Sequence, residues 1–332
     1  MSVVTRKLRE FFSTEAAGGI FLVCAAILAL VLANSPARDI YFEVVDKSHV
    51  FVNEFLMSIF FFLVGLEIRR EFSSGELRNP KKAALPIIAA LGGMIIPALI
   101  YLAFNSSGSA SMGWAIPMPT DIALALGVLA LLGSRIDSSL KIFLLTLAIS
   151  DDLFSILVIA IFYRGGLEPI KILGTIGAVI LAFLIPIPKR FSISDLIHRI
   201  HPWSAFLIIP LFALVNIGIS IDYSQVYDQL NSPVARGIII GRVVGKFVGI
   251  TLFAWIAIKL RIAHKPDSIR FREISGVAAL AGMGLTVSLF IAELSITQSS
   301  TLDEIKLGLL TSAIIAGIFG YLLLRKFSRA QY

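Results

Sequence analysis

The sequence predicts an all-α polytopic membrane protein with about ten transmembrane helices, formed by a single domain of residues 1–332. Three observations support this fold class. Hydrophobic residues make up 57% of the chain and charged residues only 15%, whereas a soluble domain carries about 25% charged residues. The apolar residues form long runs along the whole chain, which gives a mean hydropathy of +0.88. Two of the runs are interrupted by proline or glycine near their middles.

The runs have the length of membrane-crossing helices, for which about 20 apolar residues suffice. The ten candidate spans are residues 16–34, 50–68, 84–104, 114–133, 141–162, 170–187, 203–220, 236–258, 274–293 and 306–325. The first is preceded by basic residues like a signal peptide, but it is long for one and many spans follow, so we expect it to remain uncleaved. The alternating pattern of an outer-membrane barrel is absent from the sequence.

The net charge of +7 could suggest a nucleic-acid partner, but its distribution indicates membrane topology instead. Of the 29 lysines and arginines, 21 fall in the terminal arms and even-numbered loops and 6 in the odd-numbered loops. Because cytoplasmic loops are enriched in lysine and arginine, this split places both termini in the cytoplasm. We therefore expect a multi-pass protein of the bacterial inner membrane whose partners are the lipid bilayer and transported ions, with no nucleic acid.

The two interrupted spans occupy matching places in the chain. Residues 117–121 break the fourth span, the middle one of the triplet at about 84–162, and residues 282–284 break the ninth, the middle one of the triplet at about 236–325. Either break alone could be an ordinary kink. The two triplets have opposite orientation, and inverted-topology repeats with two discontinuous helices crossing near the midplane are typical of secondary transporters.

Two adjacent carboxylates, Asp151 and Asp152, lie near the centre of the fifth span. One charged residue there costs roughly 2.5–3.5 kcal/mol, so the pair must face a protein interior or a wet cavity. Two close carboxylates repel, and either a proton or a hard cation such as Na⁺ or Li⁺ relieves the repulsion. A purely structural polar network is the alternative. Since neighbouring helix residues point about 100° apart, one carboxylate can bind an ion while the other pairs with a base.

Lys246 is the expected base, since it is central in its span and flanked by small residues that permit close helix packing. We expect Arg242, one turn nearer the outer end, to extend its side chain to the membrane interface. Asp121, directly after the first break, is placed to face the positive ends of half-helices. Thr120 beside it is a plausible hydroxyl ligand for a sodium ion.

A charged cluster stands where the second span reaches the cytoplasm, and two histidines precede the seventh span. The residues are Glu67, Arg70, Glu71, His198 and His201. The cluster could be a solvated helix end, and the histidines could pack at the interface or respond to pH, because histidine titrates near neutrality. The sequence has no H-E-x-x-H motif, P-loop or carboxylate-rich calcium loop. We therefore expect no resident cofactor, no resident metal and no enzymatic activity.

At these residues the chain resembles the NhaA-type sodium/proton antiporters. The matching segments are residues 60–71, 91–99, 114–135, 140–163, 201–203, 245–246 and 282–292. The resemblance implies electrogenic, pH-regulated exchange of Na⁺ or Li⁺ for two protons. It implies that Asp152 is the main ion ligand and that Asp151 pairs with Lys246. It further implies that Thr120 and Asp121 are the threonine and aspartate of the broken helix, and that the cytoplasmic cluster belongs to a region of pH activation.

The chain departs from the family pattern in three ways. It has room for ten spans where the family has twelve, as if the sixth and seventh were deleted. The first external loop, residues 35–49, is too short for the family's β-hairpin, which mediates dimer contact, so the sequence does not favour a homodimer. Ile197 replaces a glutamate of the pH-responsive stretch, and Arg242 replaces an apolar residue.

These departures leave alternatives to an active antiporter. One is a degenerate homologue that no longer transports and is retained for another membrane role. Another is a carrier of anions or organic solutes with a similar fold. An intramembrane aspartyl protease is disfavoured because Asp151 follows Ser150 and Asp121 follows Thr120, rather than the Tyr-Asp and Gly-x-Gly-Asp settings of such enzymes.

Overall fold

The computed structural model describes residues 3–162, 169–186, 192–222 and 224–328, and within these ranges the regular structure is helical, with no strand. The side chains of Arg6, Lys7 and Arg9, which contribute to the predicted orientation, lie outside this description. So does Tyr163, where one of the family-like segments ends.

Among the described residues, seven helices are long and apolar enough to cross a membrane, and three shorter apolar helices accompany them. The long ones are Thr14–Ala33, Arg38–Ser74, Pro80–Phe104, Ser138–Phe162, Ile193–Asn216, Pro233–Lys259 and Ser299–Phe327. The shorter ones are Ile122–Leu131, Ile172–Leu184 and Thr286–Ser295. Each of the ten predicted runs overlaps one of these helices, so the chain is an all-α polytopic membrane protein.

The α-helices that build these spans follow one another along the chain. They are α1 (Val3–Ala33), α2 (Arg38–Val50), α3 (Met57–Ser74), α4 (Pro80–Phe104), α5 (Ile122–Leu131), α6 (Ser138–Phe162), α7 (Pro169–Leu184), α8 (Ile193–Trp203), α9 (Ile209–Asn216), α10 (Val226–Asn231), α11 (Pro233–Ile240), α12 (Lys246–Lys259), α13 (Phe271–Leu280), α14 (Thr286–Ser295) and α15 (Ser299–Phe327).

Short helical turns of other types join or extend these helices. The π-helical turns are η1 (Phe51–Leu56), η5 (Ser204–Ile208) and η6 (Gly241–Gly245), and the 3₁₀ turns are η2 (Glu76–Arg78), η3 (Ser109–Ala115) and η4 (Gly133–Arg135). Each π-helical turn connects two α-helices without a gap, so α2 and α3, α8 and α9, and α11 and α12 form three continuous elements. Such turns occur frequently at functional sites.

Two helix boundaries differ from the sequence expectation. Residues 35–49, expected as an external loop, largely form α2, whose charges complement the helix dipole with Asp39 in the first turn and Lys47 and His49 in the last. The stretch with His198 and His201, expected to precede the seventh span, is part of its first helix. A capping box between Ser192 and Asp195 starts α8 there, ten residues before the apolar run.

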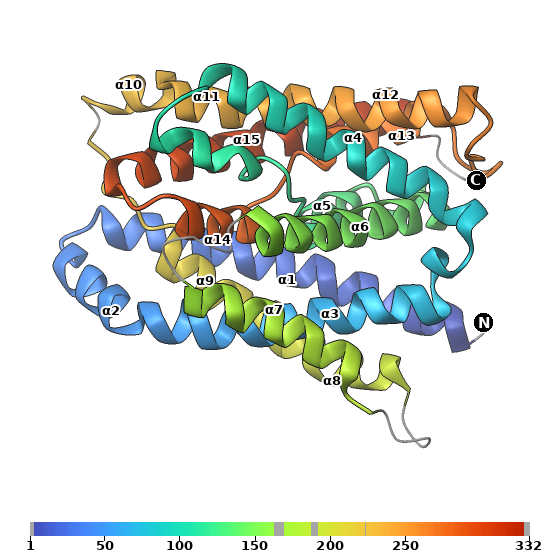
Figure 1. Cartoon of the computed structure of the whole chain (residues 1–332), viewed down its shortest axis with the longest axis horizontal. Coiled ribbons are helices and arrows are strands. Elements are labelled where there is room, and N and C mark those ends of the chain that lie inside the picture. The colour runs from blue at the N-terminus through green and yellow to red at the C-terminus, as the bar shows by residue number, and fades with distance from the viewer. Residues whose placement is uncertain (1–2, 163–168, 187–191, 223, 329–332) are drawn as a thin grey trace.

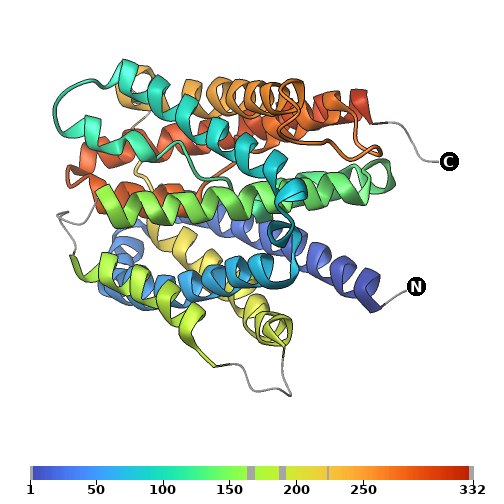
Figure 2. The same cartoon turned by 45° about the vertical axis from the view of Figure 1, so that its right-hand side comes forward.

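The long helix α4 precedes the first broken span, and the continuous helix α11–α12 precedes the second. The chain runs in opposite directions along these two helices (Figure 1). These two elements pack closely: a Cβ atom built on Gly249 would lie 2.1 Å from the carbonyl oxygen of Gly92. Helix α1 begins and α15 ends at the same end of the molecule (Figure 2), as an even number of crossings requires. Each broken span thus follows one of two long helices that pack against each other.

Candidate ion-binding site

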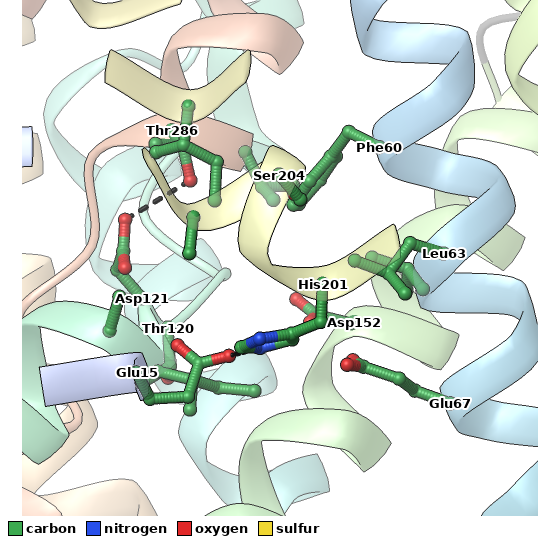
Figure 3. A pocket seen from close by; sticks show the side chains of 16 residues that line it. Glu15, Phe60, Leu63, Glu67, Thr120, Asp121, Asp152, His201, Ser204 and Thr286 are labelled. Atoms are coloured by element: carbon green, nitrogen blue, oxygen red, sulfur yellow. Dashed lines mark hydrogen bonds and ion pairs between the residues drawn. The ribbon is translucent and has the colours of Figure 1, made fainter. Parts of the chain in front are cut away.

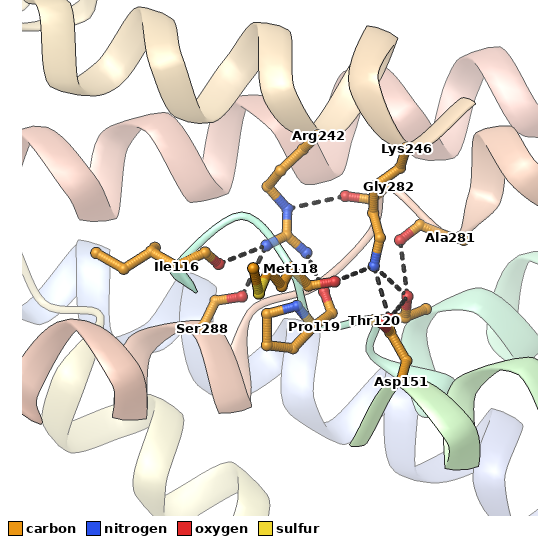
Figure 4. Close-up of polar contacts among 10 residues, drawn as sticks. All are labelled: Ile116, Met118, Pro119, Thr120, Asp151, Arg242, Lys246, Ala281, Gly282 and Ser288. Carbon is orange, nitrogen blue, oxygen red and sulfur yellow. Dashed lines mark hydrogen bonds and ion pairs between the residues drawn. The ribbon is translucent and has the colours of Figure 1, made fainter. Parts of the chain in front are cut away.

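The two interrupted spans meet in the interior of the molecule (Figure 4). The first break lies between η3 and α5, and the second between α13 and α14. The backbone N–H of Asp121 in the first break donates to the carbonyl oxygen of Met283 in the second, at 2.9 Å. The hydroxyl of Thr120 lies 3.1 Å from the carbonyl oxygen of Ala281. Backbone groups freed by one break are thus satisfied by the other, as irregular backbone at membrane depth requires.

Asp121 lies at the N-terminal ends of the two half-helices that begin at the breaks, α5 and α14. Its Oδ1 accepts a hydrogen bond of 3.3 Å from the backbone N–H of Leu124 and so caps α5. Its Oδ2 accepts one of 3.1 Å from the hydroxyl of Thr286, the first residue of α14. Helix N-termini carry partial positive charge, so a carboxylate is favoured there.

Lys246 lies on the opposite side of the crossing and pairs with Asp151. The Nζ atom is 2.7 Å from Asp151 Oδ2 and 2.6 Å from the Thr120 hydroxyl, and it also donates to the carbonyl of Met118. Both members of the ion pair are almost fully buried. The pairing of Lys246 with a carboxylate, expected from the sequence, is present in the structure.

The Thr120 hydroxyl links these groups. It can donate its single hydrogen either to Asp151 Oδ2 at 2.6 Å or to the carbonyl of Ala281 at 3.1 Å, while it accepts from Lys246. Which of these two oxygens receives the hydrogen of Thr120 should therefore depend on whether Asp151 is charged. This side chain couples the ion pair to the backbone of the second break.

Arg242 does not extend to the membrane interface, so that expectation was wrong. Its side chain is fully buried and donates to the carbonyl oxygens of Gly282 at 3.0 Å, Ile116 at 3.2 Å and Pro119 at 2.8 Å. It also donates to the hydroxyl of Ser288 at 2.7 Å. Arg242 belongs to the π-helical turn η6, directly before α12 and Lys246. The sequence could not reveal this burial, because the partners are backbone carbonyls of two distant segments.

Asp152 points away from this network into a pocket (Figure 3). The pocket is also lined by Glu15, Glu67, Thr120, Asp121, His201 and Thr286, with apolar side chains around them. Asp152 is 8% exposed, whereas Asp151 is 1% exposed. Within the part of the chain that the structure describes, Asp152 has no hydrogen bond or ion pair, and its Oδ1 is buried without a partner.

Further oxygen atoms near the pair lack partners. Asp151 Oδ1 and the hydroxyl of Ser155 are buried without a hydrogen-bond partner among the described residues. Ser155 follows Asp152 by three residues and so lies on the same face of α6. Buried carboxylate and hydroxyl oxygens that lack protein partners are the donor set that a hard cation prefers. This chemistry fits Na⁺ or Li⁺ as cargo.

The residues assigned to a pH-responsive cluster separate in the structure. Glu67 and His201 line the pocket, and His201 Nε2 is hydrogen-bonded to Glu15. Glu71 instead accepts from the backbone N–H of Glu76 at 3.0 Å, and the guanidinium of Arg70 lies 3.4 Å from the carboxylate of Glu71. Neither of them lines the pocket with Asp152.

His198 is exposed and is also absent from the pocket lining. Its neighbour Ile197 is buried in a small apolar cluster with Leu63, Leu66 and Ala182, which joins α8 to α3 and α7. The residue that stands where the related family has a glutamate thus packs helices together here. It contributes no charge to the pocket.

Glu15 belongs to this pocket although sequence reasoning did not select it. It is partly buried in α1, just before the apolar run, where it looks like an ordinary helix-end charge. One ligand atom from each of Glu15, Glu67 and His201 lies within 4.8 Å of the others, a spacing that could hold a metal ion. The signal in the sequence that could have identified Glu15 is an acidic residue at the start of a membrane span.

Two discontinuous helices that cross at mid-molecule, with three carboxylates and a lysine buried around the crossing, define an ion-coupled secondary transporter. The family model described as Na⁺/H⁺ antiporter 1 matches residues 9–174 and 172–324. The chain is 40% identical to the Na⁺/H⁺ antiporter NhaA of Escherichia coli O139:H28 over 96% of this chain and 98% of that protein.

Further relatives agree with this match. The NhaA antiporter of Shewanella frigidimarina is 40% identical over 97% of this chain and 96% of its own length, and that of Citrobacter koseri is 39% identical over 96% and 98%. The chain therefore belongs to the NhaA-type Na⁺/H⁺ antiporter family.

The comparisons also locate a shortened region. The alignments with these relatives extend over 381 positions, more than the 332 residues of the chain. The two pieces matched by the family model meet at residues 172–174. That position lies at the start of α7, where the sequence leads us to expect two missing spans.

Proposed function

We propose that this protein exchanges Na⁺ or Li⁺ for H⁺ across the bacterial inner membrane, with both termini in the cytoplasm. Membership of the family and the names of the relatives, Na⁺/H⁺ antiporters, support sodium/proton exchange. The observation that carries the proposal is the unpartnered carboxylate of Asp152, which lines a pocket beside the crossing. The skewed distribution of lysine and arginine supports the orientation.

Asp152 is the main ligand of the ion in this proposal. A sodium ion and a proton each neutralise its charge, so binding one excludes the other. The free oxygens of Asp151 and Ser155 on the same helix can complete the coordination. Thr120 and Asp121 position the two breaks around the ion path, through the contacts described above.

The exchange is electrogenic in this proposal, with two protons moved for each ion. One proton binds Asp152, and the second is carried by the Lys246–Asp151 pair, whose bond at 2.7 Å breaks when Lys246 loses its proton. One net charge then crosses the membrane per cycle. A membrane potential of 100 mV supplies about 2.3 kcal/mol for each such charge.

Glu67 and His201 make transport depend on pH in this proposal, because both line the pocket that holds Asp152. Arg70, Glu71 and His198 act less directly, since they do not line that pocket. A dimer through an external β-hairpin is not part of the proposal, because residues 38–50 form the helix α2. Light scattering of the purified protein in detergent measures its oligomeric state.

Everted membrane vesicles test the exchange. Addition of Na⁺ or Li⁺ to respiring vesicles should release protons from the lumen of wild-type vesicles, and Asp152→Asn should abolish the signal. Asp222→Asn is the matched control, because Asp222 is exposed and does not line the pocket. Equal signals from the wild type and Asp152→Asn would refute the role of Asp152.

Isothermal titration with Na⁺ at alkaline pH then separates the remaining alternative. A degenerate homologue that had lost exchange would give neither a transport signal nor heat of binding. A protein that binds Na⁺ but does not transport it would give heat only.

A further inference from the structure

Arg242 is the largest fully buried side chain of the described residues. Its guanidinium contacts both interrupted helices: it donates to Ile116 and Pro119 on the first break, and to Gly282 and Ser288 on and after the second. The four contacts are drawn together in Figure 4. Apart from the backbone hydrogen bond between Asp121 and Met283, the described hydrogen bonds that join the two breaks come from side chains, and Arg242 is one of them.

Arg242 and Lys246 differ in their partners. Lys246 pairs directly with Asp151, whereas Arg242 contacts three carbonyl oxygens and a hydroxyl and forms no ion pair with a carboxylate among the described residues. Arginine remains charged in proteins and presents donors in a rigid planar fork. A buried guanidinium surrounded by carbonyl dipoles is therefore a fixed charge, while a lysine can release its proton.

The backbone around the guanidinium leaves space for it and for nothing larger. A Cβ atom built on Gly284 would lie 1.7 Å from Arg242 Nη2 and 2.5 Å from the carbonyl oxygen of Pro119. A Cβ on Gly282 would lie 2.8 Å from the backbone oxygen of Arg242 itself. The glycines of the second break and the arginine thus fit one another, which a side chain extended to the interface would not require.

We propose that Arg242 is a positioning residue that ties the two broken helices together through their backbone carbonyls and supplies the fixed positive charge of the crossing. Lys246 also donates to the carbonyl of Met118, and in this proposal its own role is to pair with Asp151 and to carry the second proton. This inference rests on the proposed sodium/proton exchange for its transport consequences. The structural part of the inference, the tie between the two breaks, does not depend on that exchange.

The fixed charge also acts on the exchange. The ionisable groups around the crossing are Asp121 before α5, Asp151 and Asp152 in α6 and Lys246 in α12; across the pocket they are Glu67 in α3, Glu15 in α1 and His201 in α8. Arg242 donates to the carbonyl oxygen of Pro119, the residue before Thr120, whose hydroxyl contacts Asp151. A nearby positive charge makes protonation of a carboxylate less favourable. Without Arg242, the carboxylates should retain protons to higher pH, so the transport profile should move to alkaline pH.

Two variants separate the positive charge of Arg242 from its planar set of donors, and a third variant is the control. Arg242→Leu removes both, and Arg242→Lys keeps the charge but loses the planar donors. Arg236→Leu is the matched control, because Arg236 is exposed on the preceding helix, and among the described residues its side chain bonds only to Asn231. The measurements are the melting temperature in detergent and the pH profile of Na⁺-driven proton movement in everted vesicles.

We expect Arg242→Leu to melt well below the wild type and to shift its half-maximal pH by at least half a unit to alkaline. We expect Arg242→Lys to melt at a lower temperature while keeping the wild-type pH profile, and Arg236→Leu to match the wild type in both. If Arg242→Leu does not yield a monodisperse protein, that failure beside a well-behaved Arg236→Leu supports the tie, and Arg242→Lys still tests the profile.

Two results would overturn the inference. The first is an Arg242→Leu protein with the melting temperature and profile of the wild type. The second is equal loss of rate in the Leu and Lys variants at all pH values with an unmoved profile, which would leave Arg242 with no effect of its charge. Should wild-type vesicles themselves show no Na⁺-driven proton movement, the proposed exchange fails, and the melting temperatures still decide whether Arg242 ties the breaks.

Discussion

Two neighbouring residues of α6 have opposite surroundings, one at the crossing of the broken helices and the other in the pocket beside it. At the crossing, Asp151 is bonded to Lys246 and Thr120 and is 1% exposed. In the pocket, Asp152 is 8% exposed and has no hydrogen bond or ion pair among the described residues. The region that must hold its shape satisfies its charges with protein groups. The region to which we assign ion exchange leaves a carboxylate without a protein partner.

The buried cations and the acidic residues are also divided between the crossing and the pocket. Both buried cations, Arg242 and Lys246, lie at the crossing and donate to its backbone. The pocket instead gathers Glu15, Glu67 and Asp152 around one histidine. A cation entering the pocket therefore meets carboxylate oxygens. The following substitutions test this division from the largest expected effect to the smallest.

Gly284→Ala should have the largest effect, because the new methyl group would collide with the guanidinium of Arg242 and the carbonyl of Pro119. Both neighbours are fixed by hydrogen bonds, so we expect a loss of at least about 3 kcal/mol of stability, at the upper end for overpacking, and loss of transport. Thermal unfolding in detergent measures it. Gly177→Ala in α7 is the control, since a Cβ there meets nothing within 4 Å. Similar melting temperatures for the two variants would contradict a rigid crossing.

Removal of either partner of the Lys246–Asp151 pair should come next. Lys246→Gln or Asp151→Asn alone leaves an unpaired buried charge, which costs about 3–5 kcal/mol. The double variant removes both charges and should be less destabilised than the two single effects together. Chemical unfolding of all three variants measures the coupling. Strictly additive effects would show that the pair does not stabilise the crossing.

Glu67→Gln should change transport more than stability. It removes a negative charge from the pocket, so Asp152 should release its proton more readily, and the transport profile should shift to acid pH by up to about one unit. Glu43→Gln is the control, because Glu43 is exposed on α2 and pairs only with Lys47 in the described structure. The profile in everted vesicles is the measurement. An alkaline shift, or an equal shift in the control, would contradict the assigned role.

The two histidines should differ, with the smallest effect at His198. His201→Gln removes the partner of Glu15 inside the pocket and should alter the pH profile. His198→Gln changes an exposed residue outside the pocket lining and should leave the profile within about 0.2 units. The same vesicle assay compares them. A larger shift for His198→Gln would mean that the pH response lies outside the pocket.

Much of the fold was predictable because membrane insertion depends on local composition. The ten apolar runs, the two breaks and the adjacent aspartates are all read from short windows of sequence. The expectation that Asp151 and Asp152 would face different partners also needed only the helical period. The boundaries of α2 and α8 were missed, because both helices include polar stretches outside the apolar runs, and a capping box starts α8 in such a stretch.

The sequence by itself determined that the chain crosses the membrane many times and that its chemistry is placed where two helices break. Both follow from the cost of burying charge and free backbone in lipid. Only the tertiary structure decided that Arg242 turns inward to the carbonyls of both breaks, and that Glu15 joins Glu67 and His201 at the pocket. Those facts depend on how distant segments pack, and hydropathy contains no information about which buried carbonyl or carboxylate a given side chain will meet.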